Sequence, residues 1–351
     1  MSDRRSRPFA QLFVNTMDQT IQAHLREWLQ AQGLIGAADL SLKPLTGGQS
    51  NPTFLLTAGT EQFVLRKKPD GVLQKSAHAI DREYRVISAL KDTAVPVPAA
   101  LAWCDDESIV GTPFYLMSFL GGRVFVDQSL PGISSAERTA IYREMNRVIS
   151  ELHKLDIDAI GLGDYGKRED YLSRQIKRWS SQLSVATIPV PEGLQRLTEW
   201  LPEHLPEPQH AALIHGDFRL DNLIFHATEP RVIGVLDWEL STIGDPVADF
   251  AYHCMSWHIP HSLWRGIAGL DLQALGIPEE PDYQRQYFAG RAAIDPAAWR
   301  FYLAFNLFRM SAILFGIAER AQQGNANSAD AVQTGAKSGP LAELGCQIAG
   351  I

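Results

Sequence analysis

The pattern of apolar and polar residues in the first third of the chain predicts a small β-rich unit. Helical spacing predicts a helix in DQTIQAHLREWLQAQGL, which closes at Gly33. Two β-rich segments follow, LSLKPLTGGQSNPTFLLTAG and EQFVLRKKP, separated by a turn at Gly59. A helical pattern returns in SAHAIDREYRVISAL, and VPVPAALAW and PFYLMSFL then have the composition of strands. The predicted order is strand, strand, helix, strand, strand.

The pattern changes after the glycine-containing stretch GGRVF. Ser134 and Glu137 have the spacing of a capping box, and apolar residues at helical spacing follow them. The block LIHGDFRLDNLIFHATEPRVIGVLDWE predicts two short strands with loops, and the chain beyond Asp245 is mostly helical in pattern. We therefore expect an α+β protein with a β-rich N-lobe over residues 18–120 and a larger helical C-lobe over residues 121–351. A ligand is expected in the cleft between the lobes.

Two segments are candidates for a membrane span or a targeting signal, and the sequence argues against both interpretations. Residues 301–318 are the most apolar stretch, but Asn306 and Arg309 lie near the middle and the length is barely enough to cross a bilayer. A buried helix is therefore predicted. Residues 1–17 are basic without a following apolar run, so we expect a flexible extension rather than a secretory signal, with Met17 as a second candidate start.

Composition narrows the classes of partner. The 351 residues carry a formal net charge of −8, which argues against nucleic acid or an anionic membrane as the main partner. The three cysteines are far apart, so neither a disulfide framework nor a zinc pattern can be built from them. We expect a cytoplasmic protein that acts on a small molecule, and the sequence leaves the oligomeric state open.

The stretch LIHGDFRLDNLIF places several polar residues between apolar runs. Asp217 and Asn222 have the spacing of a kinase catalytic loop, and Asp237 ends the apolar strand VIGVL. Asn222 and Asp237 are a hard-oxygen pair of the type that holds Mg²⁺, which leaves Asp217 to orient an acceptor hydroxyl and take its proton. Each residue alone is typical of a cap or turn, so the prediction depends on the three together.

His215, in the same stretch, has a competing interpretation as a metal ligand. No second histidine or cysteine stands at ligand spacing, so a core or supporting role is favoured. A metal hydrolase centred on His215 is disfavoured for the same reason.

HGDFRLDN followed by VLDWE resembles the aminoglycoside phosphotransferase and choline kinase family, which has a protein-kinase-like bilobal fold. The resemblance runs from about Leu40 to Ala318. It implies an ATP- or GTP-dependent kinase that uses Mg²⁺ at Asn222 and Asp237, with Asp217 as the catalytic residue. Arg219 matches a position where kinases often carry a basic residue that touches the transferred phosphate; the alternative is a surface arginine.

The resemblance also assigns residues of the N-lobe to the nucleotide. FVLRKKP resembles the strand with the phosphate-binding cation, and alternation puts Val64, near the adenine, on the same face as Arg66. Arginine stands where the family usually has lysine, yet it also binds phosphate oxygens well, and Lys67 is the alternative. Glu83 is expected on the inward face of its helix, paired with Arg66; the alternative is a solvated surface carboxylate.

Loop segments supply the other expected nucleotide contacts. LTGGQSNPTF occupies the place of the glycine-rich loop without a full GxGxxG pattern, and YLMSFLGGRVF resembles the hinge between lobes. Gly48, Ser50 and Asn51 are expected to donate to the β- and γ-phosphates. Met117 is expected at the back of the adenine pocket, with Ser118, Phe119 and Leu120 meeting the adenine through their backbone. Ile224 is either the floor of that pocket or an ordinary core residue.

The branch of the family bears on the acceptor. FVLRKKP, SAHAIDREYRVISAL and VIGVLDWELSTIGDPVADFAYH most resemble the kinase domain of acyl-CoA dehydrogenase family proteins 10 and 11, which implies a hydroxyacyl-CoA or hydroxy acid as acceptor. An aminoglycoside or choline-type amino alcohol is the alternative acceptor. A different class of function is also open, in which the protein is a nucleotide-binding pseudokinase that regulates a partner. Asp245 and Asp249 are expected to cap a helix and brace the catalytic loop.

The segment from Trp257 to Arg300 also bears on the acceptor. Its aromatic and basic residues suit an apolar, anionic acceptor, unless they simply form a helical core. They are Trp257, His258, His261, Trp264 and Arg265.

Overall fold

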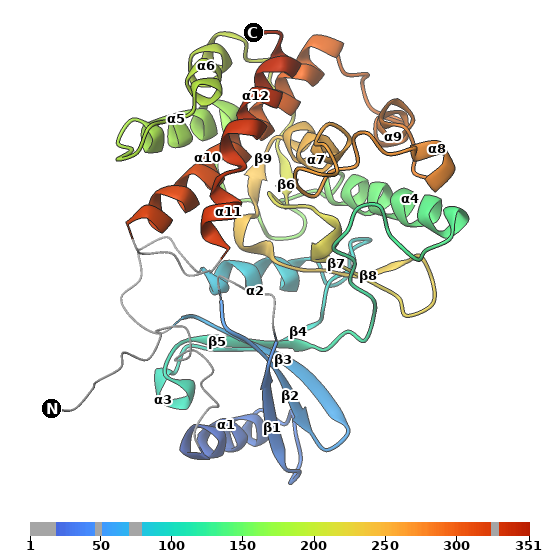
Figure 1. Ribbon diagram of the computed structural model, residues 1–351. Coiled ribbons are helices and arrows are strands. Elements are labelled where there is room, and N and C mark those ends of the chain that lie inside the picture. The colour runs from blue at the N-terminus through green and yellow to red at the C-terminus, as the bar shows by residue number, and fades with distance from the viewer. Residues whose placement is uncertain (1–18, 46–50, 70–78, 324–329) are drawn as a thin grey trace, which may run out of the picture. The chain divides into compact units, whose positions relative to one another are not determined.

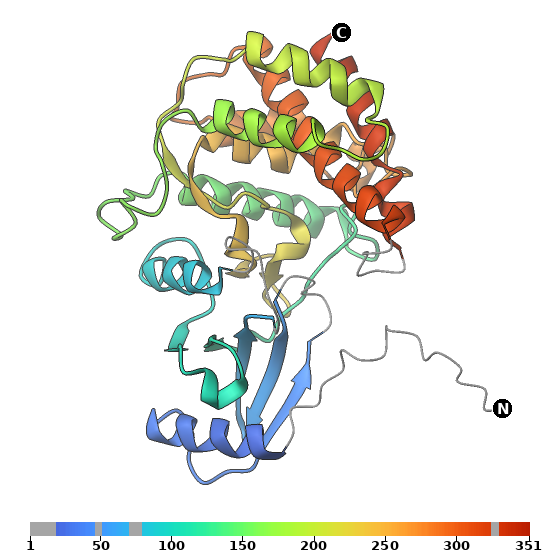
Figure 2. The same cartoon turned by 90° about the vertical axis from the view of Figure 1, so that its left-hand side faces the viewer.

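The computed structural model describes residues 19–45, 51–69, 79–323 and 330–351. Internal contacts divide the described residues into two compact units (Figures 1 and 2). Unit 1 contains the described part of Met1–Lys91 together with Val97–Gly121. Unit 2 contains Asp92–Pro96 and the described part of Gly122–Ile351.

Unit 1 is built on a five-stranded antiparallel sheet with the strand order β1-β2-β3-β5-β4. Leu25 and Leu29 of α1 pack with Phe63 and Leu65 of β3 in its hydrophobic core. Helix α2 contacts β4 and β5 (Figure 1). The elements are α1 (Gln19–Ala31), β1 (Leu40–Pro44), β2 (Thr53–Ala58), β3 (Glu61–Lys67), α2 (Ile80–Ala89), β4 (Ala100–Cys104), α3 (Glu107–Val110) and β5 (Phe114–Ser118).

The predicted order of elements in this unit is close to the observed one. The first β-rich segment forms two strands, β1 and β2, on either side of its glycine-containing stretch. The turn at Gly59 joins β2 to β3 with a φ of 61°, a left-handed conformation that glycine adopts readily. The short helix α3 was not predicted, because it is a single turn capped by Asp106 between two strands.

Unit 2 is mostly helical and contains two small antiparallel sheets, β6-β9 and β7-β8. Its helices are α4 (Ser135–Leu152), α5 (Tyr171–Leu183), α6 (Glu192–Trp200), α7 (Pro246–Cys254), α8 (Leu272–Leu275), α9 (Glu280–Tyr287), α10 (Pro296–Gln322), α11 (Ala331–Gly335) and α12 (Ser338–Ala349). Its strands are β6 (Ala212–Ile214), β7 (Leu223–Phe225), β8 (Val232–Val235) and β9 (Thr242–Gly244). Single turns of 3₁₀ helix are η2 (Leu201–Glu203), η3 (Leu220–Asn222), η4 (Trp238–Leu240) and η5 (Met255–Trp257).

Helix α10 is the central helix of unit 2 and contacts α5, α6, α7, α11 and α12 (Figure 1). It is long and apolar enough to cross a membrane, but 83% of its most apolar window is buried inside the protein. Its polar residues are engaged there, since Asn306 donates to the carbonyls of Ala248 and Tyr302 at 2.9 Å. The prediction of a buried helix over residues 301–318 is confirmed.

At the start of α4, one of the two hydrogen bonds of the predicted capping box is formed. The Ser134 hydroxyl accepts the backbone N–H of Glu137 at 3.2 Å, as an N-cap does. The Glu137 carboxylate, however, accepts from Arg123 at 2.7 Å instead of closing the box. Arg123 also pairs through its backbone with Phe225 at the edge of β7, so this ion pair ties the start of α4 to the strand that follows the loop between β6 and β7.

Candidate active site

The loop between β6 and β7 carries Asp217, and Gly216 fixes its course. Gly216 has a φ of 81°, and a Cβ added there would lie 2.6 Å from the Leu240 carbonyl oxygen. Any other residue would therefore need both a left-handed backbone and a displacement of the segment that carries Leu240. The close approach holds the loop against the 3₁₀ turn η4, directly after Asp237.

Replacing Gly216 with alanine is expected to lower the free energy of unfolding. The loss should exceed the loss caused by the left-handed backbone alone by about 1–3 kcal/mol. Gly132→Ala is the matched control, because Gly132 has the same φ of 81° and nothing within 4 Å of its added Cβ. Chemical denaturation of both variants measures the difference. Equal losses of stability would show that the approach to Leu240 does not constrain the loop.

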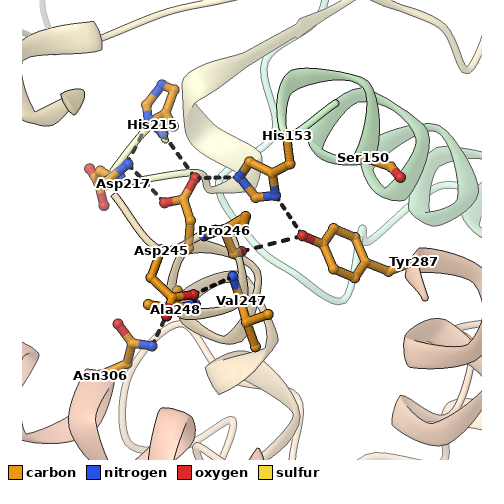
Figure 3. A network of polar contacts seen from close by, with 12 residues as sticks. Ser150, His153, His215, Asp217, Asp245, Pro246, Val247, Ala248, Tyr287 and Asn306 are labelled. Atoms are coloured by element: carbon orange, nitrogen blue, oxygen red, sulfur yellow. Dashed lines mark hydrogen bonds and ion pairs between the residues drawn. The ribbon is translucent and has the colours of Figure 1, made fainter. Parts of the chain in front are cut away.

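Asp249 of α7 holds the same loop in place by accepting hydrogen bonds from its backbone. Its Oδ1 accepts the backbone N–H of Gly216 at 2.8 Å, and its Oδ2 accepts that of His215 at 2.9 Å and the Nε2–H of His153 at 3.1 Å (Figure 3). Burial would raise the pKa of Asp249, but the hydrogen bonds from His153 and the loop bring it below its ordinary value. Asp249 is therefore a carboxylate at neutral pH. The predicted brace role is confirmed, and Asp245 caps α7 at Val247 and Ala248.

His153 completes this brace as a neutral side chain. Burial lowers the pKa of His153, which outweighs the opposite effect of Asp249. With Nε2 donating to Asp249, Nδ1 is left to accept the Tyr287 hydroxyl at 2.7 Å (Figure 3). No local pattern in the sequence pointed to His153, because it reaches the loop from the C-terminal end of α4.

His215 supports the loop and has no free nitrogen for a metal. Its Nδ1 accepts the backbone N–H of Asp217 at 3.2 Å, and its Nε2 lies 2.9 Å from the Leu236 carbonyl oxygen. A carbonyl can only accept, so the ring proton is on Nε2. His215 thus links Asp217 to the residue before Asp237, in agreement with the predicted supporting role.

Three side chains hold the Asp217 carboxylate in one orientation. Oδ1 accepts from the Tyr252 hydroxyl and lies 2.9 Å from Nε of Arg219, and Oδ2 accepts from Nδ2 of Asn222 at 3.2 Å. The side chain of Asp217 is 16% exposed, so a small molecule can reach it. This is the arrangement of a carboxylate that is positioned in advance for an incoming hydroxyl.

Tyr252 and Arg309 belong to this site, although neither was predicted as a site residue. Burial and the Asp217 carboxylate raise the pKa of Tyr252, which keeps its hydroxyl protonated as a donor. The Arg309 guanidinium lies 5.3 Å from the centre of the Tyr252 ring and donates to the Gly216 carbonyl at 2.7 Å. Arg309 of α10 therefore contacts both Tyr252 of α7 and Gly216 of the loop that carries Asp217.

Asn222 and Asp237 fit the requirements of a magnesium site. Nδ2 of Asn222 donates to the backbone oxygen of Asp217 at 2.8 Å as well as to its carboxylate, which leaves Oδ1 as the atom that can bind a metal. Leu236 donates its backbone N–H to the Asn222 carbonyl at 2.8 Å, so the segment that ends in Asp237 runs beside Asn222. An amide oxygen and a carboxylate are ligands that Mg²⁺ prefers.

Asp237 has a left-handed backbone with a φ of 64°. Aspartate and asparagine tolerate this conformation better than most residues. The conformation turns the chain sharply from β8 into η4, directly after the residue that contacts both His215 and Asn222.

Arg219 lies in a chain of opposite charges beside Asp217. Its guanidinium is also 3.5 Å from Asp221, which in turn accepts from Arg265 at 2.7 Å. Burial would lower the pKa of Arg219, but the nearby carboxylates of Asp217 and Asp221 raise it overall. Arg219 is thus a fixed cation next to the carboxylate. Its predicted contact with a transferred phosphate stays a prediction.

Unit 1 contains the predicted ion pair. Nε of Arg66 lies 2.8 Å from Oε2 of Glu83, and Nη2 donates to Oε1 at 3.1 Å. Tyr115, opposite Arg66 in the sheet, also donates to Glu83 at 3.0 Å. Lys67 instead donates to the Val110 carbonyl at 3.2 Å. The structure therefore selects Arg66 over Lys67 as the partner of Glu83.

Two residues that were expected to contact the nucleotide make hydrogen bonds within unit 1. Asn51 is fully buried and its Nδ2 donates to Glu83 at 3.1 Å, so it supports the ion pair, and its contact with a phosphate stays a prediction. A buried carboxylate requires several donors, which explains this use of Asn51. The N–H of Ser118 donates to Ala99 O at 2.9 Å and its hydroxyl accepts from Ala99 N, while its backbone contact with an adenine stays a prediction. Gly48 and Ser50 lie outside the described residues.

The other predicted nucleotide residues have these positions. In unit 1, Val64 faces Met117 across β3 and β5, on the face that carries Arg66. Phe119 is exposed and Leu120 is partly exposed after β5. In unit 2, Ile224 is the half-buried residue of β7 between two buried ones. Their contacts with an adenine stay predictions.

Comparison with known proteins gives one family and several close relatives. The profile of the phosphotransferase enzyme family matches residues 41–302. Acyl-CoA dehydrogenase family member 10 of Mus musculus is 45% identical over 318 residues, which cover 89% of this chain and 30% of that protein. Acyl-CoA dehydrogenase family member 11 of Homo sapiens is 40% identical over 94% of this chain and 43% of that protein. The chain thus spans less than half the length of these relatives.

Solved structures share the fold. A Ralstonia eutropha JMP134 protein assigned to the aminoglycoside phosphotransferases is 49% identical, with a TM-score of 0.86 over 93% of this chain and 98% of that one. The GDP complex of aminoglycoside 2'-phosphotransferase-IIIa matches with a TM-score of 0.60 at 16% identity, over 93% of this chain and 99% of that one. These similarities confirm the predicted α+β, protein-kinase-like fold.

Proposed function

Because the chain belongs to the phosphotransferase enzyme family, we propose that it is a kinase that transfers the γ-phosphoryl group of ATP or GTP to a hydroxyl group of a small molecule. The family, and its branch with acyl-CoA dehydrogenase family members 10 and 11, confirm the resemblance found in HGDFRLDN and VLDWE.

The oriented carboxylate of Asp217 is the observation that carries this proposal. The hydroxyl of the acceptor donates to Asp217, which takes the proton as the acceptor oxygen forms its bond to the γ-phosphorus. The bond from that phosphorus to the bridging oxygen breaks, and its electron pair leaves with the nucleoside diphosphate. Tyr252 and Asn222 keep the carboxylate oriented throughout, and Arg219, which lies beside Asp217, would balance the charge of the transferred group.

Asn222 and Asp237 would hold Mg²⁺, through the amide oxygen of one and the carboxylate of the other. When bound, Mg²⁺ neutralises charge on the phosphate oxygens. We assign the nucleotide phosphates to Arg66, whose guanidinium Glu83 holds in place, and the adenine to the side of the sheet with Val64 and Met117.

For the acceptor, we propose a hydroxyacyl-CoA or a hydroxy acid. The relatives named acyl-CoA dehydrogenase family members support an acyl compound. The similar Ralstonia structure is assigned to the aminoglycoside phosphotransferases, which makes an aminoglycoside the second candidate, followed by choline-type amino alcohols. Retention of Asp217, Asn222 and Asp237 argues against a regulatory pseudokinase. A cytoplasmic location and a small-molecule partner without nucleic acid or membrane complete the proposal.

A turnover screen tests this function. Mg-ATP and Mg-GTP are each supplied with hydroxyacyl-CoAs, free hydroxy acids, aminoglycosides and choline, and mass spectrometry measures the gain of one phosphoryl group by each acceptor. We expect the gain on a hydroxyacyl-CoA or a hydroxy acid. Nucleotide binding without a gain on any acceptor would favour the regulatory alternative.

A further inference from the structure

A small cavity in unit 2 adjoins the Asp217 carboxylate. It has a volume of about 30 Å³, and two of its lining residues, Arg219 and Tyr252, are the ones that contact Asp217. Met255, Ile259 and Met310 supply apolar surface. The volume is enough for a methyl-sized group or a water molecule, so the cavity suits one end of a small acceptor better than a whole one.

Two guanidiniums line the cavity. Asp217, Arg219, Asp221 and Arg265 form one chain of ion pairs, yet of these four only the two arginines line the cavity. The side chain of Arg265 is 34% exposed, so its guanidinium can add a contact to the one it makes with Asp221. A ligand group with negative or partly negative oxygen is favoured beside two guanidiniums, and a cationic group is disfavoured.

The backbone fixes Arg265 at this place in an unfavourable conformation. Arg265 has a φ of 50°, in the left-handed region that arginine rarely adopts. The next residue, Gly266, packs so closely that an added Cβ would lie 1.8 Å from the Ile259 carbonyl oxygen. Ile267 and Ala268 then donate to the carbonyls of Ser256 and Ile259. Strained residues that the surrounding structure holds in place are concentrated at functional sites.

Gln128 gives the cavity an unsatisfied polar group. The residue is 7% exposed and lines the cavity, and its Oε1 has no hydrogen-bond partner within the described part of the chain. Buried polar atoms of this kind are normally satisfied by a ligand or by water.

We propose that this cavity receives the part of the acceptor next to its reactive hydroxyl and that Arg265 selects the acceptor. Arg265 recognises a carbonyl or carboxylate oxygen, and the apolar wall takes a short hydrocarbon segment. The pair of arginines makes the cavity a poor site for a polycation such as an aminoglycoside. This inference depends on the proposed function, which it makes more specific.

Arg265→Gly tests the assignment, because glycine removes the guanidinium and relieves the left-handed backbone. The acceptors are β-hydroxybutyryl-CoA, free β-hydroxybutyrate and kanamycin. We expect the KM of the preferred acceptor to rise roughly tenfold to a hundredfold, as for the loss of a charged hydrogen bond. The KM of the nucleotide should not change, and the unfolding midpoint should stay the same or rise. Arg265→Lys should restore part of the acceptor affinity.

The control is Arg231→Gln, which removes an exposed arginine that also pairs with a carboxylate, that of Glu229, at 3.0 Å. It should leave every KM unchanged. An effect of Arg265→Gly on the CoA thioester alone would identify a thioester carbonyl as the recognised group, and an effect on the free acid would identify a carboxylate. An unchanged KM for every phosphorylated acceptor would overturn the role of Arg265 and leave the proposed function standing.

If the turnover screen finds no phosphorylated acceptor, the proposed function fails, and calorimetric titration decides on the cavity separately. Binding of β-hydroxybutyryl-CoA or β-hydroxybutyrate by the wild type that Arg265→Gly weakens would support the cavity as their site. Equal binding by both proteins, or no binding, would overturn it.

Discussion

Asp217→Asn is expected to lower kcat by about 10²- to 10⁴-fold while nucleotide affinity stays within about twofold of wild type. The amide is close to the carboxylate in shape, so the loop keeps its geometry, but it cannot take the proton of the acceptor. The contacts of Asp217 with Tyr252, Arg219 and Asn222 place it where the acceptor hydroxyl must arrive, and none of them gives it a role in holding the nucleotide.

Single-turnover kinetics measures the chemical step of Asp217→Asn, and calorimetry measures nucleotide binding. Asp271→Asn is the matched control, since Asp271 is a carboxylate of unit 2 that accepts a backbone N–H in α8 at 3.0 Å. It should turn over at the wild-type rate. Loss of nucleotide binding with preserved turnover in Asp217→Asn would reverse the assigned role.

Asp237→Gly is expected to reduce the Mg²⁺-dependent affinity for ATP by roughly a hundredfold, because a charged metal ligand contributes several kcal/mol. Glycine is the appropriate replacement, since it accepts the φ of 64° that would strain alanine. Asp237→Asn keeps an oxygen and tolerates the same backbone, so its loss should be smaller.

The affinity for ATP measured in the presence of a metal chelator provides the reference for the two Asp237 variants. It should be equal in wild type and both variants, because Asp237 acts on the nucleotide only through the metal. An unchanged Mg²⁺-dependent affinity in Asp237→Gly would contradict the metal assignment. A fall that persists in the chelator would indicate damage to the loop itself.

Local patterns in the sequence predicted the parts of the site that are close together in the chain. Asp217, Asn222 and Asp237 are recognisable because the catalytic loop and the two short strands around it fit within one block of the sequence. The alternation of β3 likewise predicted that Val64 and Arg66 share a face, since the period of a strand is two residues. The buried helix α10 was predictable from its apolar composition and its two central polar residues.

The supporting contacts were not predictable, because they join residues far apart in the chain. Tyr252 reaches Asp217 across 35 positions and Arg309 reaches Gly216 across 93. Only tertiary packing of α7 and α10 brings them to the loop. A partial signal existed for Tyr252, which follows Asp249 by three residues and therefore lies on the same side of its helix.

Asn51 makes a contact that the resemblance of loops did not suggest. Its place after two glycines pointed to a phosphate, and that contact stays a prediction. The buried carboxylate of Glu83 accepts hydrogen bonds from the Asn51 amide, from Arg66 and from Tyr115. The need of a buried charge for donors decided the position, and the sequence does not show that need.

Phosphorus NMR of one reaction mixture tests the central claim most directly. The mixture contains the protein, Mg-ATP and β-hydroxybutyryl-CoA, and the spectrum follows the γ-phosphate of ATP, phosphate monoester and inorganic phosphate together. If the protein is a phosphotransferase that uses Asp217, the monoester signal should grow as fast as the γ-phosphate signal falls. Asp217→Asn should stop both changes. A γ-phosphate signal that falls while only inorganic phosphate appears would contradict transfer to this acceptor.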